Sequence, residues 1–396
     1  MIQTEEIARI MTDMLPKLGA EDTAVIGVNL RALTSRLRHL EDAFPEGVQH
    51  SIAIKTNPHP KMLEFLVSQG FGLEAASIEE VRMALAAGCS PAQIIFDSPV
   101  KTRNEIREIS SFPGILANVN SLEELDRFDA DFQGILGIRI NPQVHTGAPD
   151  LYDVSKNESK FGVPVDMKEH IVDAALRYPV RALHMHSGSQ MKNLNIQRGA
   201  LKELKRIADT INTEAPGKIK VLDIGGGLPT ESLGSKTQME AYGQIVAEVF
   251  RGSGYLLVTE FGQWVQAEAG FALSVIEYVL TPNKVFIHLG ADFFMRDVYT
   301  KARSFPMTVW NGDATQVQGM DKVYDIAGPL CFAGDYLAHG IQLPTVLQEG
   351  QYLFIDHTGA NTYALWSRHC SRTLPATWAW DGNSMVKWSN RLTIGF

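Results

Sequence analysis

The chain has 396 residues, of which 45% are hydrophobic and 20% are charged. This length predicts a large core and two domains. A formal net charge of -9 at pH 7, without any basic run, argues against nucleic acid as a partner. The longest apolar stretches are short and interrupted by charges, so we expect no membrane-spanning helix and no membrane partner.

The first residues and the cysteines indicate the compartment. The segment MIQTEEIARIMTDMLPKL carries acidic residues early and predicts an amphipathic helix rather than a signal peptide. Cys89, Cys331 and Cys370 are widely spaced and contain no CxxC pair, so no disulfide framework is expected. We therefore expect a cytoplasmic protein, in which Cys89 and Cys370 are small buried residues.

Short apolar runs recur along residues 45–265, and each is followed by a helix-like amphipathic segment. This alternation is typical of parallel βα units. Eight repeats predict a closed, TIM-like (β/α)₈ barrel, and an open doubly wound sheet is the alternative. The absence of an obvious reversal favours closure. The predicted strands are His50–Lys55, Gly72–Ala76, Gln93–Asp97, Ile115–Val119, Gly134–Ile140, Ala182–His186, Val221–Ile224 and Leu256–Glu260.

Strand-like runs dominate after residue 265, with little helix between them. This change predicts a β-rich second domain of residues 266–396, joined by residues 1–44 because Thr23–Leu30 is also strand-like. Its other predicted strands are Val275–Leu280, Lys284–Leu289, Met307–Trp310, Lys322–Ile326 and Tyr352–Asp356.

Local signals mark some helix ends in the barrel. The segments Ser77–Glu80 and Ser121–Glu124 both fit a capping box, in which a hydroxyl and a carboxylate satisfy free amides of the first turn. Gly70 and Gly88 lie where helices should end, because glycine adopts the left-handed conformation at little cost.

Polar residues are concentrated where the predicted barrel strands end. The carboxyl ends of strands in such a barrel meet at one face, which is where active sites lie. The sequence therefore predicts one site built from many strands. Its candidate residues are Lys55, Glu74, Asp97, Arg139, His186, Gly225–Gly227 and Glu260.

Lys55 is the first candidate for chemistry. Strand alternation directs Ala53 and Lys55 to the same face, into the barrel. Desolvation of an inward-facing lysine lowers its pKa, as an amine that condenses with an aldehyde requires. The alternative is a surface lysine at a strand edge.

Two loops that follow strands could bind a cofactor. DIGGGLP, at Asp223–Pro229, exposes backbone amides that suit an anion such as phosphate, although glycine clusters also form ordinary tight turns. In HMHSGSQ, His186 could lie against an aromatic ring and Ser189 could donate to a phosphate oxygen. A metal site at His184 and His186 lacks a third ligand with suitable spacing, so we expect no metal.

Glu260 ends the last predicted strand. A buried carboxylate there could keep a ring nitrogen protonated, which makes the ring an electron sink. A glutamate that caps a helix is the alternative.

Together these segments resemble the fold-type III pyridoxal 5'-phosphate (PLP) decarboxylases, which include ornithine and diaminopimelate decarboxylases. The resemblance runs from about Ala24 to Pro375. It implies an alanine racemase-like PLP-binding barrel with a C-terminal β-domain, and a homodimer with shared active sites. The matching motifs, in chain order, are IAIKTN, FGLEAASIEEV, LGIRINP, SKFGV, HMHSGSQ, DIGGGLP, TEFGQ, AGPLCFAGD and DHTGANTY.

The resemblance implies a role for each matching residue. Lys55 holds PLP as a Schiff base, and Cys331 manages the proton after CO₂ leaves, for which a thiol of tunable pKa is suited. Glu260 pairs with the pyridinium nitrogen, and Asp335 follows Cys331 in the same motif. The remaining cofactor contacts are Glu74, Glu80, Arg139, His186, Ser189, Gly225, Gly226 and Gly227.

The chain departs from this family at the phosphate and substrate positions. Gln263 replaces the usual arginine of EPGR, and Asn361 replaces the usual tyrosine of the GAY motif, so the cofactor contacts there are weaker or different. Arg296 is retained in FMRDVY, with Tyr299 nearby. With Asp335, these residues are the candidate substrate contacts.

The resemblance implies α-decarboxylation of a small-molecule amino-acid substrate, and these positions favour one with a distal carboxylate or acidic conjugate. Examples are diaminopimelate and a citryl-amino acid of siderophore assembly, and the products are the amine and CO₂. One alternative is a PLP-dependent racemase, against which Glu260 and Cys331 argue. Another is a non-catalytic PLP-binding homologue, which would tend to lose Lys55 or Cys331.

Overall fold

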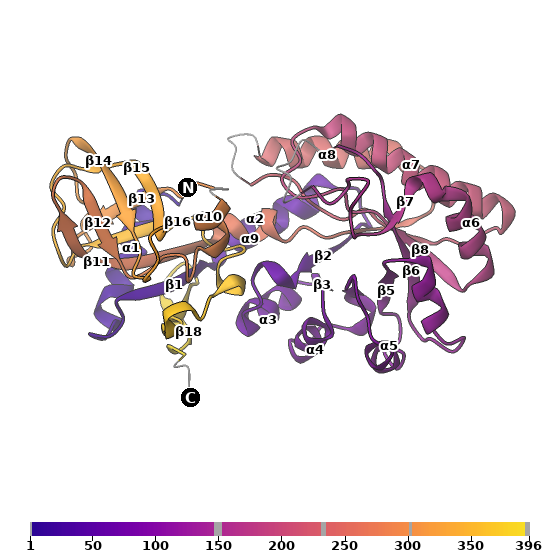
Figure 1. Cartoon of the computed structure of the whole chain (residues 1–396), viewed down its shortest axis with the longest axis horizontal. Helices are drawn as coiled ribbons and strands as arrows, with labels where there is room; N and C mark the ends of the chain where they lie inside the picture. Colours follow the sequence, from indigo (N-terminus) through magenta and orange to yellow (C-terminus); the bar gives the residue numbers. More distant parts are fainter. Residues whose placement is uncertain (1, 146–152, 231–234, 301–302, 393–396) are drawn as a thin grey trace. The chain divides into compact units, whose positions relative to one another are not determined.

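The computed structural model describes residues 2–145, 153–230, 235–300 and 303–392. The chain divides into two compact units (Figure 1). One unit, the barrel unit, is Leu37–Trp264. The other, the sheet unit, combines Met1–Arg36 with Val265–Phe396.

The barrel unit contains a closed ring of eight parallel strands within the part of the chain that the structure describes. Each strand pairs with the next, and β10 pairs back onto β2. The predicted (β/α)₈ barrel is confirmed. The short strand β7 (Val163–Pro164) pairs with β6 outside the ring. The ring runs through β2 (Gln49–Ala53), β3 (Gly72–Ala75), β4 (Ile94–Phe96), β5 (Leu116–Val119), β6 (Ile135–Asn141), β8 (Val180–His184), β9 (Val221–Asp223) and β10 (Leu256–Thr259).

The interior of the barrel is apolar below its polar end. Ile95, Leu116, Ala182, Val221 and Val258 come from five different strands and form one buried cluster. Burying each of the larger side chains contributes about 1.5–3 kcal/mol, which helps to keep the ring closed. The polar residues at the strand ends therefore lie next to a packed apolar core.

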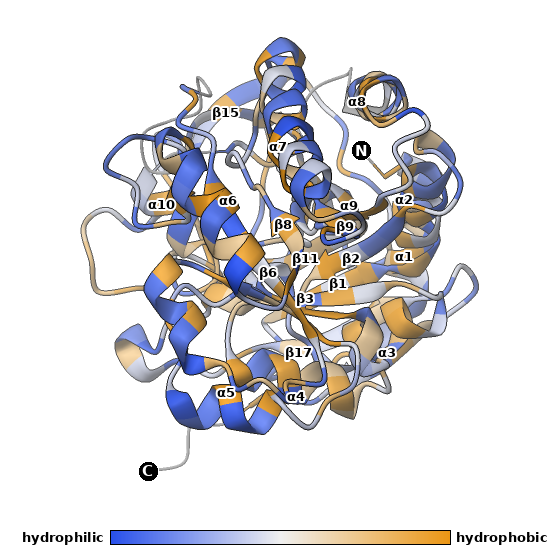
Figure 2. Cartoon of the chain, turned by 90° about the vertical axis from the view of Figure 1, so that its right-hand side faces the viewer, coloured by the Kyte–Doolittle hydropathy of each residue, from blue (hydrophilic) through white to orange (hydrophobic). Residues whose placement is uncertain are grey.

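Helices surround the barrel and bury one side each. In α7 the buried residues recur every three or four positions from Gln197 to Ile211, as expected for an amphipathic helix. Figure 2 shows the contrast: β3 and β8 inside are mainly apolar, whereas α5 and α6 mix polar and apolar residues. The helices are α2 (Leu30–Ala43), α3 (Pro60–Ser68), α4 (Ile78–Ala86), α5 (Arg103–Ile109), α6 (Lys168–Arg177), α7 (Leu194–Glu214), α8 (Ser235–Val249), and the 3-10 helix η4 (Leu122–Arg127).

The two predicted capping boxes behave differently. Ser77 caps α4, and its hydroxyl accepts from the amide three residues ahead at 3.2 Å. The prediction of a capping box at Ser121 is wrong, because the side chain of Ser121 makes no capping hydrogen bond and η4 is a 3-10 helix. The carboxylate of Glu124 is instead shared between the amide of Asn120 at 2.8 Å and the buried amine of Lys101 at 3.0 Å.

The sheet unit is a mixed sheet in the order β15-β14-β12-β11-β1-β17-β18, with β16 paired to β11 and β13 to β16. The predicted strand at Thr23–Leu30 is β1 (Ala24–Asn29), which lies between antiparallel β11 and parallel β17. β15, β17 and β18 were not predicted. The remaining strands are β11 (Gly270–Leu280), β12 (Lys284–Ile287), β13 (Met307–Trp310), β14 (Asp321–Ala327), β15 (Tyr336–Pro344), β16 (Tyr352–Asp356), β17 (Ala376–Trp380) and β18 (Met385–Ser389).

The predicted N-terminal amphipathic helix is confirmed as α1 (Thr4–Met14). It buries Ile7, Ile10 and Met11 in an apolar cluster with Trp378 and other residues of the sheet unit. The short helices α9 (Gln263–Gln266) and α10 (Met295–Thr300) complete the assignment. Among the helices that the structure describes, none is long and apolar enough to cross a membrane.

Candidate active site

Lys55 lies at the mouth of the barrel. It belongs to a single 3-10 turn (Ile54–Thr56) that directly follows β2. Its Nζ donates to Glu74 Oε2 at 2.5 Å, and Glu74 is on the neighbouring strand β3. The side chain of Lys55 is 53% exposed, whereas that of Glu74 is 1% exposed. The side chain of Lys55 is therefore partly accessible, whereas its counter-ion is buried.

The pKa of Lys55 lies above its ordinary value. Burial lowers this pKa, but the negative charges of Glu74, Glu260 and Asp97 raise it by more. The expectation that desolvation would lower the pKa of Lys55 is thus wrong for this set of neighbours. Burial also raises the pKa of Glu74 to about 7, although Lys55 opposes the shift.

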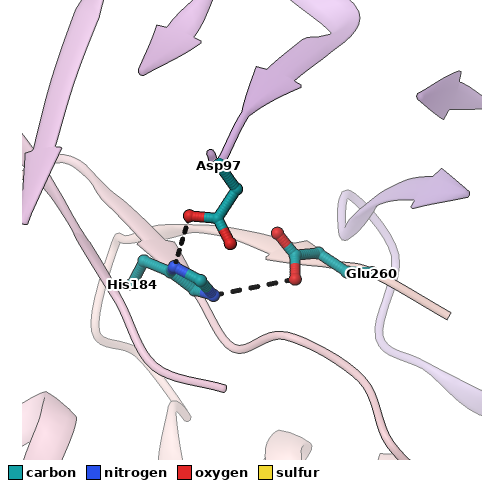
Figure 3. Close-up of side chains that lie close together, drawn as sticks. All are labelled: Asp97, His184 and Glu260. Carbon is teal, nitrogen blue, oxygen red and sulfur yellow. Dashed lines mark ion pairs between the residues drawn. The ribbon is translucent and has the colours of Figure 1, made fainter. Parts of the chain in front are cut away.

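A row of buried charges crosses the same end of the barrel (Figure 3). His184 is the last residue of β8, while Asp97 and Glu260 directly follow β4 and β10. His184 Nδ1 is 3.2 Å from Asp97 Oδ1, and its Nε2 is 3.6 Å from Glu260 Oε2. Arg139 Nη1 donates to the other oxygen of Asp97 at 2.9 Å. Sequence analysis missed this pairing, although Asp97 and Glu260 were both recognised as polar strand ends.

The charges in this row stabilise one another. Burial lowers the pKa of His184, but Asp97, Asp223 and Glu260 raise it well above its ordinary value. Burial raises the pKa of Glu260, yet His184 lowers it, and the result is about 2. Glu260 is therefore a buried carboxylate that stays ionised at neutral pH.

Ligand atoms of Asp97, His184 and Glu260 lie within 4.8 Å of one another, close enough to suggest a metal site. The two nitrogens of His184, however, face different carboxylates. A histidine that ligates one ion uses one nitrogen. The arrangement is thus that of an ion-paired row.

His186 contacts both Glu260 and the glycine-rich loop. Its Nδ1 is 3.9 Å from Glu260 Oε2 and accepts from the amide of Gly226 at 3.2 Å. Burial lowers the pKa of His186 to about 3, against the pull of Glu260. The imidazole is therefore neutral at pH 7.

The loop at Gly225–Gly227 requires glycine. A Cβ at Gly226 would lie 2.6 Å from the carbonyl oxygen of Glu260, and one at Gly227 would lie 1.8 Å from that of Gly188. The amide of Gly225 donates to Asp223 Oδ1 at 3.0 Å. Since the Gly226 amide is also engaged, the phosphate contacts of these two amides stay predictions.

The other predicted cofactor residues are spread over both units. Ser189 lies in the loop after β8, and Gln263 begins α9, both in the barrel unit. Glu80, on α4, accepts from the amide of Ala76 at 2.7 Å. Asn361 is in the sheet unit, where it is buried with a φ of 59°.

The predicted substrate residues and Cys331 lie in the sheet unit. Tyr299, on α10, stacks on Phe332 with ring centroids 5.3 Å apart, directly beside Cys331. Arg296 is three residues before Tyr299 on the same helix. This brings the segment carrying Arg296 and Tyr299 next to the segment carrying Cys331.

Asp335 is buried and holds the turn that carries Cys331. Its two oxygens accept from the amides of Ala291 at 2.6 Å and Leu330 at 2.7 Å. Its predicted substrate contact therefore competes with two internal hydrogen bonds. Cys331 is exposed. Cys370 is exposed too, so the expectation of a buried residue is wrong there, whereas Cys89 is buried as expected.

Comparisons with known proteins agree with this architecture. Residues 30–267 match the family described as "Pyridoxal-dependent decarboxylase, pyridoxal binding domain", and residues 269–359 match its "C-terminal sheet domain". Diaminopimelate decarboxylase of Pseudomonas fluorescens is 28% identical over 91% of this chain and 88% of its own. That of Pseudomonas aeruginosa is 29% identical with the same coverage.

Solved structures show the same fold. Diaminopimelate decarboxylase from Helicobacter pylori, complexed with L-lysine, aligns with a TM-score of 0.86 at 22% identity, covering 94% of this chain and 95% of that one. The arginine decarboxylase of Paramecium bursaria Chlorella virus, bound to agmatine, aligns with a TM-score of 0.79 at 19% identity, covering 93% and 98%.

Proposed function

We propose a substrate class for this chain, which belongs to the family of pyridoxal-dependent decarboxylases. It is a carboxy-lyase with PLP as its cofactor. The proposed reaction removes the α-carboxylate of an amino acid whose far end carries a second carboxylate, and diaminopimelate is the first candidate. One observation carries the PLP chemistry of this proposal: the half-exposed side chain of Lys55 and an ionised, buried Glu260 lie at the same barrel mouth.

The residues of the barrel fit PLP. Glu260 Oε1 is buried and has no hydrogen-bond partner among the described residues, so it can accept from a protonated ring nitrogen. Lys55 would bind the aldehyde carbon, and His186 would lie beside the ring. Ser189 and the glycine loop would hold the phosphate. When bound, PLP supplies an electron-accepting ring for the charge left by departing CO₂.

Proton handling falls to three side chains of this chain. Glu260, as an anion, keeps a proton at the ring nitrogen and so preserves the electron sink. Glu74 can exchange a proton with Lys55 across 2.5 Å, since its pKa is near 7. Cys331 would donate a proton to the carbon that loses the carboxylate. We propose that a second copy of the chain supplies it, in a homodimer.

Arg296 supports the choice of substrate. A guanidinium carried by α10, three residues before Tyr299, is suited to bind a distal carboxylate. The named relatives are diaminopimelate decarboxylases. The citryl-amino acid predicted from the sequence has no support among them and ranks second. Because the matched families and the solved neighbours are decarboxylases, the racemase alternative is not favoured.

A decarboxylation screen tests the proposal. PLP-loaded protein is given diaminopimelate, lysine, ornithine and citryl-amino acids, and CO₂ release is measured. We expect release from diaminopimelate, and none from Lys55→Ala. Borohydride should fix the visible absorbance of the loaded protein onto Lys55. A protein that stays colourless with PLP would refute the enzymatic assignment, and loss of optical rotation without CO₂ would indicate racemisation.

The Arg296 assignment has its own test. Arg296→Gln should raise KM for diaminopimelate about tenfold or more, as expected when a charged hydrogen bond is lost. Lys322→Gln, at an exposed position of β14, is the control and should leave KM unchanged. Equal KM values for Arg296→Gln and wild type would remove the distal-carboxylate contact from this residue.

A further inference from the structure

Three side chains far apart in the sequence meet behind the proposed cofactor position. We propose that Asp97 and His184 are positioning residues for Glu260: a doubly protonated His184 bridges the two carboxylates and leaves one oxygen of Glu260 for the cofactor. This inference rests on the proposed function, because it assigns a task to residues of that same site.

The geometry favours two protons on His184. A neutral imidazole has one N–H and one lone pair, so it can face one carboxylate favourably and must repel a second. His184 Nδ1 is 3.2 Å from Asp97, and Nε2 is 3.6 Å from Glu260 (Figure 3). The side chain of His184 is 0% exposed, so water cannot relieve the repulsion. The imidazolium is the state that both carboxylates attract.

The negative charges of Asp97 and Glu260 favour this state, and three further groups near the row affect its charge balance. Arg139 ion-pairs with the second oxygen of Asp97. His186 is neutral, because burial lowers its pKa to about 3. Burial and the nearby Glu260 raise the pKa of Asp223 well above its ordinary value. The ionisable groups that act on the row are Lys55, Glu74, Asp97, Lys101, Arg139, His184, His186, Asp223 and Glu260.

The bridge determines which oxygen of Glu260 is available. Oε2 faces His184 and His186, whereas Oε1 is buried with no hydrogen-bond partner in the described part of the chain. A buried unpaired carboxylate oxygen is costly unless a donor reaches it. A protonated ring nitrogen would be that donor. Asp97 and His184 thus act on the cofactor only through Glu260.

His50 provides a matched comparison in the same barrel. It lies on β2 and is buried, but its Nδ1 is 2.7 Å from the hydroxyl of Thr259 rather than from a carboxylate. Phe44 and Phe71 are its aromatic neighbours. Burial lowers the pKa of His50 to about 4. Of these two buried histidines in one unit, His184 should therefore be positively charged and His50 neutral.

Nitrogen NMR of histidine-labelled, cofactor-free protein tests the bridge directly. We expect His184 to be protonated on both ring nitrogens at pH 7, and His50 on one only. Asp97→Asn should make His184 neutral at pH 7. Assignment through the backbone amide of His184 keeps the wild-type result available even if a variant unfolds. A neutral His184 in the wild type would overturn the proposal, as would an unchanged His184 in Asp97→Asn.

Kinetics of the loaded enzyme supply a second readout. His184→Gln and Asp97→Asn should lower kcat roughly tenfold to a hundredfold, as for other residues that orient a ligand's partner, with little change in KM. Both should shift the pH at which the visible absorbance of bound PLP changes. Asp97→Glu should recover part of kcat, because it restores the anion. The control His50→Gln should leave kcat unchanged.

The two proposals fail in different ways. A chain that releases no CO₂ from any substrate refutes the proposed function, while the protonation state of His184 is still read from the cofactor-free protein. Full decarboxylase activity in His184→Gln, with an unshifted absorbance profile, refutes the positioning role alone. Thermal unfolding of each variant against His50→Gln identifies any loss that comes from misfolding.

Discussion

Three carboxylates control the charge of Lys55. Because Glu74, Glu260 and Asp97 raise its pKa above the ordinary value, the amine is almost fully protonated at neutral pH. An aldehyde reacts with the neutral amine only. Glu74, at 2.5 Å and with a pKa of about 7, is the nearest base for the proton that must leave. The acidic neighbours therefore make attachment of the cofactor strongly dependent on pH.

Glu74→Gln should shift this dependence to lower pH. Removing one negative charge lowers the pKa of Lys55, so a larger fraction of the amine is neutral at any pH below that pKa. The rate at which PLP absorbance develops after mixing should therefore reach its maximum at a lower pH than in the wild type. Glu64→Gln removes an exposed carboxylate on α3 and is the matched control. Coincident profiles for Glu74→Gln and wild type would contradict the assignment.

The three thiols should differ in reactivity. Cys370 is exposed, whereas Cys89 is buried and burial raises its pKa to about 11. Since the thiolate is the reactive form, Cys89 should be inert in the folded protein. In a Cys331→Ser background, we expect one equivalent to react rapidly with a thiol reagent and a second only after unfolding. Two rapid equivalents in this background would show that Cys89 is accessible.

At the scale of single residues, the sequence predicted which residues end the barrel strands better than it predicted their ion pairs and pKa values. Lys55, His186 and Glu260 were found because each stands at the end of a predicted strand. The ion pair between Asp97 and His184 was missed, because it joins two strands whose separation in the barrel cannot be read from spacing. The prediction of a lowered pKa for Lys55 was wrong for the same reason, since this pKa depends on carboxylates at the ends of three other strands.

At the scale of elements, continuity of apolar residues explains most of what was predictable, although the fully buried strand β17 was missed as well. All eight barrel strands lie within or overlap the predicted runs, because each is a short apolar segment buried inside the barrel unit. β15 (Tyr336–Pro344) was missed, and most of its residues are partly or fully exposed. Such a strand is stabilised by pairing with β14 rather than by an apolar face, and pairing leaves little trace in the sequence.

A buried lysine joins three consecutive elements of the barrel unit. Lys101 Nζ donates to Ser98 O at 2.7 Å, to Asn118 O at 2.6 Å and to Glu124 at 3.0 Å, and its side chain is 0% exposed. It thereby links the start of α5 to β5 and to η4. Loss of the Lys101 amine would leave Glu124 Oε1 and the carbonyl oxygens of Ser98 and Asn118 without this donor.

Lys101→Met should lower the free energy of unfolding by about 3–5 kcal/mol, as expected when one partner of a buried ion pair is removed. Urea unfolding of the PLP-free protein measures the loss. The control is Arg82→Met, which breaks the exposed pair with Glu108 at 2.7 Å and should cost far less. Similar losses for the two variants would show that burial does not set the strength of the Lys101 pair.

At the scale of the whole molecule, the residues with proposed roles in the reaction are divided between the two units. Lys55 and Glu260 belong to the barrel unit, whereas Cys331 and Arg296 belong to the sheet unit. If a second copy supplies Cys331, two inactive variants should complement each other. Mixing Lys55→Ala with Cys331→Ser and allowing the subunits to exchange should restore about a quarter of wild-type activity, since half of the dimers are mixed and each has one complete site.

Decarboxylation by the mixture and by each variant alone measures this effect. Lys55→Ala mixed with itself is the control for protein concentration. A mixture as inactive as its components would show that each chain uses its own Cys331, or that no dimer forms.

The position of β1 imposes an order on events at the ribosome. β1 is made among the first 30 residues, but its neighbours β11 and β17 end at Leu280 and Trp380. At translation speeds of about 5–20 residues per second, β1 emerges roughly 20–70 s before β17. The barrel can close in that interval, while β1 keeps two unpaired edges on a strand of six residues, five of which are apolar or glycine. Nascent chains of this protein should therefore be chaperone clients through β1 until the last strands are released.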